Sequence, residues 1–225
     1  MKFVKVVLGL LLVLLVTGCA TTMKAGLDKK TEKIDLAEDC LFLLTAELSN
    51  EYKPSYQPDA LVLNVETPNA SSSEQRFNYP VDSDGTFNQR LGNKYIFRGL
   101  LKPGKYVIRG IAGNKLAFPF VGTFYMPLHC EIEAKKGQVI DLGKVVAQIR
   151  ERKGNEFRAG PVVPLLDQAV TGFSGGTFDV QVLASNETDT RWMKSLFPAL
   201  RNVEIVPNPL PLFDREKAQK WWEAH

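Results

Sequence analysis

Hydrophobic and polar residues alternate along much of the chain, which is typical of half-buried β-strands. The alternation is clear over residues 61–66, 130–135 and 177–184. Residues 36–48 are apolar almost throughout, which fits a buried strand or a buried helix, and the strands that follow favour a strand. Turn residues separate these segments. The sequence therefore predicts a mainly β protein with an antiparallel β-sandwich over residues 36–150.

The pattern changes in the last third of the chain. Gly160-Pro161 suggests a connector, and the last alternating strand is followed by helical spacing over residues 186–197. A short strand at 203–206 and a final helix over residues 214–225 complete the chain. We expect these elements to form a small α/β appendage, residues 161–225, that ends in a C-terminal helix.

Two lysines precede an apolar run, Val6–Val16, at the start of the chain. This run is too short to span a bilayer, which needs about 20 residues, but it fits the core of a signal peptide. Val16-Thr17-Gly18-Cys19 follows and resembles the lipobox of bacterial lipoproteins, with a branched apolar residue, a small residue and then cysteine. The alternatives are a plain secretory signal and a short membrane anchor.

The resemblance implies a protein anchored in the cell envelope. Residues 1–18 would be removed as a signal peptide, and Cys19 would carry the lipid on its thiol and its new amine. Each buried methylene contributes about 0.8 kcal/mol, so several acyl chains form an effectively permanent anchor. Ala20 replaces the Asp that usually retains lipoproteins in the inner membrane, so we expect the outer membrane, on its periplasmic face or surface, if the host is Gram-negative. Residues 19–35 are expected to form a tether, with a short surface helix as the alternative.

Acylation of Cys19 would leave Cys40 and Cys130 in an oxidising compartment. In extended strands Cys40 shares a face with Phe42, and Cys130 shares a face with Ile132, so both thiols would point inward. A bridge would close a loop of about 90 residues and stabilise the fold by about 4–5 kcal/mol in the chain-entropy model. We expect a disulfide between Cys40 and Cys130, with two separate buried thiols as the alternative.

Hairpin turns carry a second resemblance. The motifs are Asp82-Ser83-Asp84-Gly85-Thr86-Phe87, Phe97-Arg98-Gly99-Leu100 and Lys102-Pro103-Gly104-Lys105-Tyr106-Val107-Ile108. They resemble the D-x-D-G-x-F and L-x-P-G-x-Y hairpins of the carboxypeptidase regulatory-like, or transthyretin-like, β-sandwich family. An extra Leu101 and the long step from Phe87 to Phe97 depart from that pattern. The resemblance implies a module that recognises or supports other molecules and is not catalytic.

Charge and composition exclude several classes of protein. The chain of 225 residues has 28 basic and 25 acidic residues, a net charge of +3, which is too balanced for a dedicated nucleic-acid binder. Removal of the signal peptide takes two lysines away and leaves 26 basic residues against 25 acidic ones, a net charge of +1. Apolar residues make up 44% and charged residues 24%, as in ordinary globular proteins. We expect no nucleic-acid partner.

Few residues are arranged for catalysis or metal binding. Gly172-Phe173-Ser174-Gly175-Gly176 matches the G-x-S-x-G expression, but a strand follows Ser174 where a nucleophile elbow needs a helix. His129 and His225 are the only histidines and offer little acid–base chemistry. The Asp82 turn lacks the further ligands of a calcium loop, and His129 and Cys130 would point to opposite faces of a strand. We expect no catalytic residue, no metal and no cofactor.

Two surface features fit either a solvated surface or a partner. The mixed charges of residues 150–153 would form a solvated rim or a docking patch, and Trp221 and Trp222 would pack on the body or face a partner. The leading hypothesis is a lipid-anchored, non-catalytic envelope protein that binds another protein or a glycan as a scaffold or accessory factor. The alternatives are an envelope serine hydrolase using Ser174 and a purely structural lipoprotein.

Overall fold

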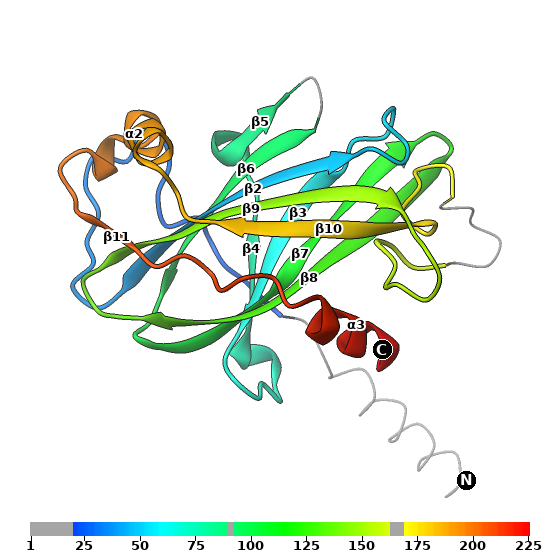
Figure 1. Cartoon of the computed structure of the whole chain (residues 1–225). Helices are drawn as coiled ribbons and strands as arrows, with labels where there is room; N and C mark the ends of the chain where they lie inside the picture. Colours follow the sequence, from blue (N-terminus) through cyan, green and yellow to red (C-terminus); the bar gives the residue numbers. More distant parts are fainter. Residues whose placement is uncertain (1–19, 90–91, 163–168) are drawn as a thin grey trace, which may run out of the picture.

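The computed structural model describes residues 20–89, 92–162 and 169–225. The predicted signal peptide, residues 1–18, and the predicted lipid-attachment residue, Cys19, lie outside the described residues. Within those residues the chain forms two β-sheets and two α-helices, as Figure 1 shows. The prediction of a mainly β protein with a C-terminal helix is confirmed.

The first sheet has the strand order β1-β4-β3-β7-β8. Its strands are β1 (Thr21–Thr22), β4 (Arg76–Pro80), β3 (Asp59–Glu66), β7 (Gly104–Ala117) and β8 (Phe120–Ala134). Neighbouring strands are antiparallel except β1 and β4, which run parallel. A 3₁₀ turn, η1 (Ser73–Gln75), lies between β3 and β4.

The second sheet has the order β10-β9-β2-β6-β5, and β11 also pairs with β9. Its strands are β10 (Gly176–Leu183), β9 (Val139–Glu151), β2 (Cys40–Asn50), β6 (Asn93–Leu101), β5 (Thr86–Asn88) and β11 (Ile205–Pro207). β2 and β11 run parallel to β9, so the expectation of purely antiparallel pairing is corrected. The register of β2 on β9 shifts beside Gly143, where φ is 82°, which marks a β-bulge.

The last third of the chain extends the second sheet. The predicted appendage strands, β10 and β11, both pair with β9 and form no sheet of their own, because β9 is long enough to accept one partner at each end. Helix α2 (Glu187–Leu196) begins at Asn186, whose side chain accepts the N–H of Asp189 at 3.0 Å. The short turn η3 (Pro198–Leu200) follows, and helix α3 (Arg215–Glu223) begins at Asp214.

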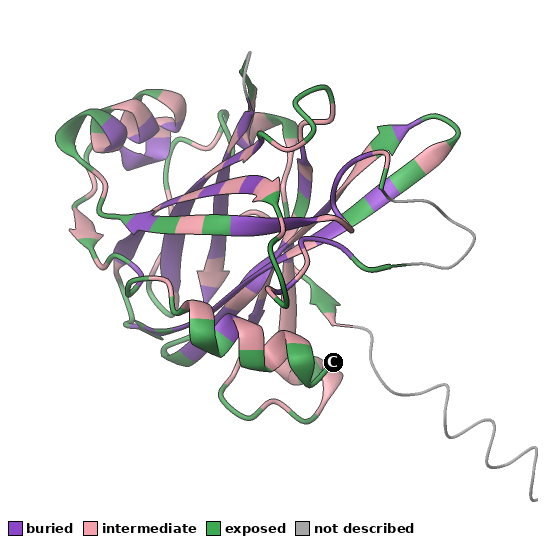
Figure 2. Ribbon diagram, turned by 45° about the vertical axis from the view of Figure 1, so that its right-hand side comes forward, coloured by how far each residue is buried: buried purple, intermediate pink, exposed green. Residues whose placement is uncertain are grey.

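The hydrophobic core lies between the two sheets, where Figure 2 shows buried residues on the facing strands. Phe42 of β2 and Tyr79 of β4 meet there edge to face, with ring centroids 4.8 Å apart. The other face of β2 is buried as well, because Leu41 and Leu43 pack under α2 and η3. Burial on both faces explains why residues 40–48, the part of the apolar segment 36–48 that lies in β2, are apolar almost throughout.

Residues 20–35, expected to be a tether, pack against the fold. Thr21 and Thr22 pair with Phe77 and Asn78 of β4, and Leu27 is only 2% exposed. Residues 20–39, which we call the strap, therefore form part of the folded body. The expectation missed this because the contacts of the strap are made with residues far away in the sequence.

Candidate functional site

Ser174 lies in the turn that leads into β10. Its carbonyl accepts a hydrogen bond from the Arg158 guanidinium, and the strand that follows begins at Gly176. Among the described residues, no hydrogen bond joins the Ser174 side chain to His129 or His225. The structure thus places Ser174 in a glycine-rich turn and not on an elbow between a strand and a helix.

Cys40 and Cys130 are both buried and free, so the expected disulfide is corrected. Both thiols face the central core, as predicted, but they lie at different positions along the strands. The backbone of Lys135 approaches the Cys40 thiol. Lys135 lies five residues beyond Cys130, about 16 Å along an extended chain, whereas a disulfide needs Cα atoms within about 7 Å. Burial raises the pKa of Cys130 to about 11 and raises the pKa of Cys40 as well.

The Asp82 turn has a structural role. The Asp82 carboxylate accepts the N–H of Gly85 at 2.9 Å and two hydrogen bonds from the Arg98 guanidinium, at 2.8 and 3.0 Å. Asp84 accepts the backbone N–H of Lys29 at 3.0 Å, which joins the turn to the strap. His129 faces outward and Cys130 inward, and no cluster of three metal-ligating side chains exists in the described ranges.

A groove follows the outward face of β8, and it is the candidate site. Its three hollows have volumes of about 420, 540 and 220 Å³, and we call them the outer, central and aromatic hollows. The outer and central hollows share Glu131, and the central and aromatic hollows share Trp221 and His225. We call the whole the β8 groove.

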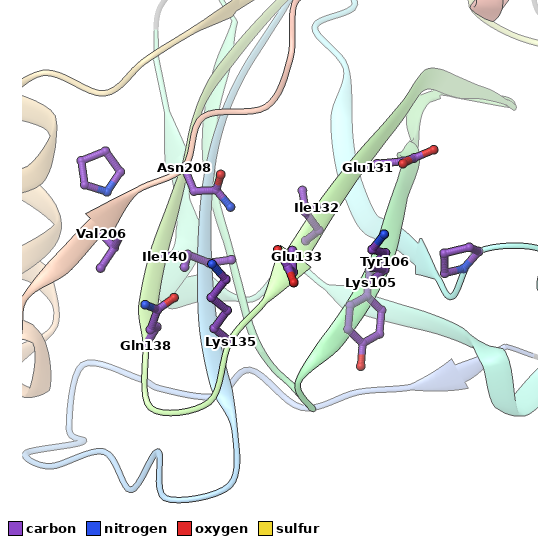
Figure 3. A pocket seen from close by; sticks show the side chains of 12 residues that line it. Lys105, Tyr106, Glu131, Ile132, Glu133, Lys135, Gln138, Ile140, Val206 and Asn208 are labelled. Atoms are coloured by element: carbon purple, nitrogen blue, oxygen red, sulfur yellow. The ribbon is translucent and has the colours of Figure 1, made fainter.

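The alternation of β8 produces the groove. Its outward side chains line the hollows in turn, in the order Tyr125, Pro127, His129, Glu131 and Glu133. Because a strand rises about 3.3 Å per residue, this row is about 26 Å long. Figure 3 shows the outer hollow between Asn208 beside β11 and the hairpin that carries Lys105, Glu131 and Glu133.

Helix α3 places Trp221 across the middle of the groove. The indole lies 5.0 Å from the Tyr125 ring and 5.1 Å from the His129 ring, and the His225 ring stacks on it at 4.9 Å, measured between centroids. The Arg109 guanidinium lies 6.0 Å from the same indole. Trp222 packs against the core and lies 5.7 Å from the Arg152 guanidinium, and it also lines the aromatic hollow beside Trp221.

His129 is the most unusual residue of the groove. It has a left-handed backbone, with φ at 52°, beside a register shift between β7 and β8, and it is 5% exposed. The Lys217 ammonium donates to its carbonyl at 2.8 Å. Burial and the nearby charges of Arg109 and Lys217 lower the pKa of His129 to about 4. Its Nε2 is buried and has no hydrogen-bond partner in the part of the chain that the structure describes.

The central hollow combines both signs of charge. Glu66 of β3 lies 4.0 Å from Arg76 of β4 and 3.4 Å from Arg109 of β7. Lys217 and Glu131 complete a set of three basic and two acidic side chains. These residues come from four strands and one helix, so no local sequence motif predicts that they lie together. The alternation in residues 130–135, which turns Glu131 and Glu133 outward, is the one sequence feature that indicates part of the set.

The comparisons with known proteins returned no family. No family model, curated protein or solved structure matches the chain. Among the helices formed by residues 20–89, 92–162 and 169–225, none is both long and apolar enough to cross a membrane.

Proposed function

We propose that the protein is a lipid-anchored, non-catalytic protein of the cell envelope that binds a glycan chain in the β8 groove. The lipobox-like segment ending at Cys19 supports the anchor. If the host is Gram-negative, Ala20 after the cysteine supports the outer membrane as its location. The groove supports the binding role, since it is an elongated surface lined by convergent polar groups.

The chemistry of the central hollow carries the choice of a glycan. Arg76, Arg109 and Lys217 donate hydrogen bonds, whereas Glu66 and Glu131 accept them. A sugar hydroxyl both donates and accepts, so a row of hydroxyls matches such a mixture. The near balance of charge favours a ligand of little net charge over a polyanion.

A protein partner fits the groove less well. Buried centres of protein interfaces are rich in large apolar side chains and poor in charges. Among the residues that the structure describes, the large apolar side chains that are exposed lie outside the groove; they are Leu61, Leu116, Phe118, Val121, Val162, Leu183 and Leu212. The groove itself carries charged side chains along most of its length.

We also propose a transthyretin-like sandwich as the finer description of the fold. Two stacked sheets and the structured Asp82 turn between β4 and β5 support it. The parallel pairing of β2 with β9 departs from the antiparallel sandwich expected from the sequence.

Binding of soluble envelope oligosaccharides to the purified protein, measured by calorimetry, tests the proposal. We expect Glu131→Ala to weaken binding by about tenfold or more, because a hydrogen bond to a charged group contributes about 1.5–3 kcal/mol. Glu32→Ala, an exposed carboxylate on the strap, is the matched control and should leave binding unchanged. If no oligosaccharide bound and a single protein crosslinked to the groove, the ligand would be a protein and the glycan proposal would be wrong.

A further inference from the structure

The strap leaves almost no free chain between Cys19 and the folded body. Thr21 and Thr22 already pair with β4, and the N–H of Met23 donates to the Asn78 carbonyl at 2.8 Å. Two residues of extended chain reach about 7 Å at most. A lipid on Cys19 would therefore hold this edge of the first sheet close to the lipid headgroups.

The rest of the strap is fixed to the body and cannot supply slack. The Arg98 guanidinium donates to the Leu27 carbonyl at 2.5 Å, and the N–H of Ala199 donates to the Thr31 carbonyl at 3.1 Å. Gly26 passes so close to Leu100 that an added Cβ would lie 2.8 Å from its side chain. The position of the anchor is thus set by folding.

The parallel register of β1 and β4 identifies the surface nearest the anchor. Thr21 lies opposite Phe77, so the chain enters the sheet beside Arg76. The Arg76 side chain donates to the Ala70 carbonyl at 3.4 Å, which joins β4 to the loop of residues 67–75. That loop is polar, with exposed Ser71 and Glu74, and it also forms one wall of the central hollow.

From this placement we propose that the anchored protein rests with the loop of residues 67–75 on the bilayer surface. The partner of this surface is a layer of lipid headgroups, since the polar loop suits contact and not insertion. The central hollow then opens at the membrane, and a glycan bound there is held beside the lipids. This inference rests on the proposed lipid attachment at Cys19.

The test uses the full-length, processed protein in vesicles of phosphatidylethanolamine and phosphatidylglycerol that carry a short-range quencher on a fraction of the headgroups. A fluorophore is attached at S71C in the loop or at T188C on α2, both exposed positions. Figure 1 shows α2 far from the start of β4, where this loop ends. Cys40 and Cys130 are buried and leave the labelling specific. We expect several-fold stronger quenching at S71C than at T188C.

Two further measurements separate the possible failures. A flexible fifteen-residue Gly-Ser insert between Cys19 and Ala20 should abolish the difference between the two positions. Equal quenching at S71C and T188C in protein that has incorporated labelled palmitate would overturn the orientation and leave the anchor standing. Absence of palmitate from the wild-type protein, as in a Cys19→Ser control, would overturn the anchor and this inference with it.

Discussion

A single residue, His129, combines backbone strain with burial in the groove. Left-handed backbone is rare outside glycine, and asparagine tolerates it better than most residues. Here the Lys217 ammonium holds the carbonyl of His129, and Trp221 covers its ring. The imidazole stays neutral because burial, and then Arg109 and Lys217, oppose a positive charge. The groove thus keeps an unprotonated polar edge near neutral pH.

The first prediction at this scale concerns the pH dependence of stability. Histidine titrates near 6.5 in the unfolded chain, whereas the pKa of His129 is about 4 in the folded chain. Between these values the unfolded state binds a proton that the folded state does not, so the free energy of unfolding falls as the pH drops. When the pH falls from 7 to 5, the titration of His129 should lower the free energy of unfolding by roughly 2 kcal/mol. His129→Asn, which accommodates the backbone, should remove that loss in denaturant titrations. If the wild type and His129→Asn lost the same free energy of unfolding between pH 7 and pH 5, the loss could not be assigned to His129.

At the scale of elements, the position of Trp221 depends on how α3 is attached. The Glu156 carboxylate accepts hydrogen bonds from Arg150 at 2.6 and 2.7 Å and from Arg215 at 2.9 Å. Asp179 of β10 lies within 2.8 Å of Arg150 and 3.2 Å of Arg215. This network joins the segment after β9, strand β10 and the first turn of α3. It lowers the pKa of Glu156 to about 2, chiefly through the hydrogen bonds from Arg150.

Glu156→Gln should loosen α3. We expect faster amide hydrogen exchange in α3 and a loss of about 1 kcal/mol of stability, because the network is partly exposed to solvent. Asp179→Asn, at a carboxylate that is half exposed, should have a smaller effect. The contribution of Glu156 is present above about pH 4.5 and is lost as the pH falls towards 2, so it leaves the His129 measurement undisturbed. Unchanged exchange in α3 would show that other contacts hold the helix.

Local patterns predicted the strands and the helices, but not their partners. Alternation identified β3 and most of β10, and helical spacing identified α2, because these depend on neighbours in the sequence. The parallel pairing of β2 with β9 has no local signal, since a strand buried on both faces reads the same in either direction. The same reasoning applies to the groove. Glu66, Arg109 and Lys217 come from three separate elements and meet only after the sheet and α3 have formed.

At the scale of the whole molecule, the strap connects the edge of the first sheet to the outer side of the second. It pairs with β4 at one end and approaches η3 at the other, where Thr31 accepts the N–H of Ala199. Between these ends lies Arg98 of β6, which is 3% exposed and bonds both Leu27 and Asp82. Its two partners lie 71 and 16 positions away in the sequence, so no neighbouring pattern indicated a role for it.

Arg98→Met should release the strap while leaving both sheets in place. The change leaves the Leu27 carbonyl and the Asp82 carboxylate without their guanidinium partner, which should lower the free energy of unfolding by about 2–4 kcal/mol. Trypsin should then cut faster after the strap lysines Lys24, Lys29, Lys30 and Lys33, whereas in vesicles the quenching at S71C should persist because β1 stays paired with β4. Lys24→Ala, at an exposed side chain, is the control for stability and quenching. If Arg98→Met destabilised the protein but left tryptic cleavage of the folded strap unchanged, the strap would have to be held by its other contacts, such as those of Lys29 with Asp84 and of Thr31 with Ala199.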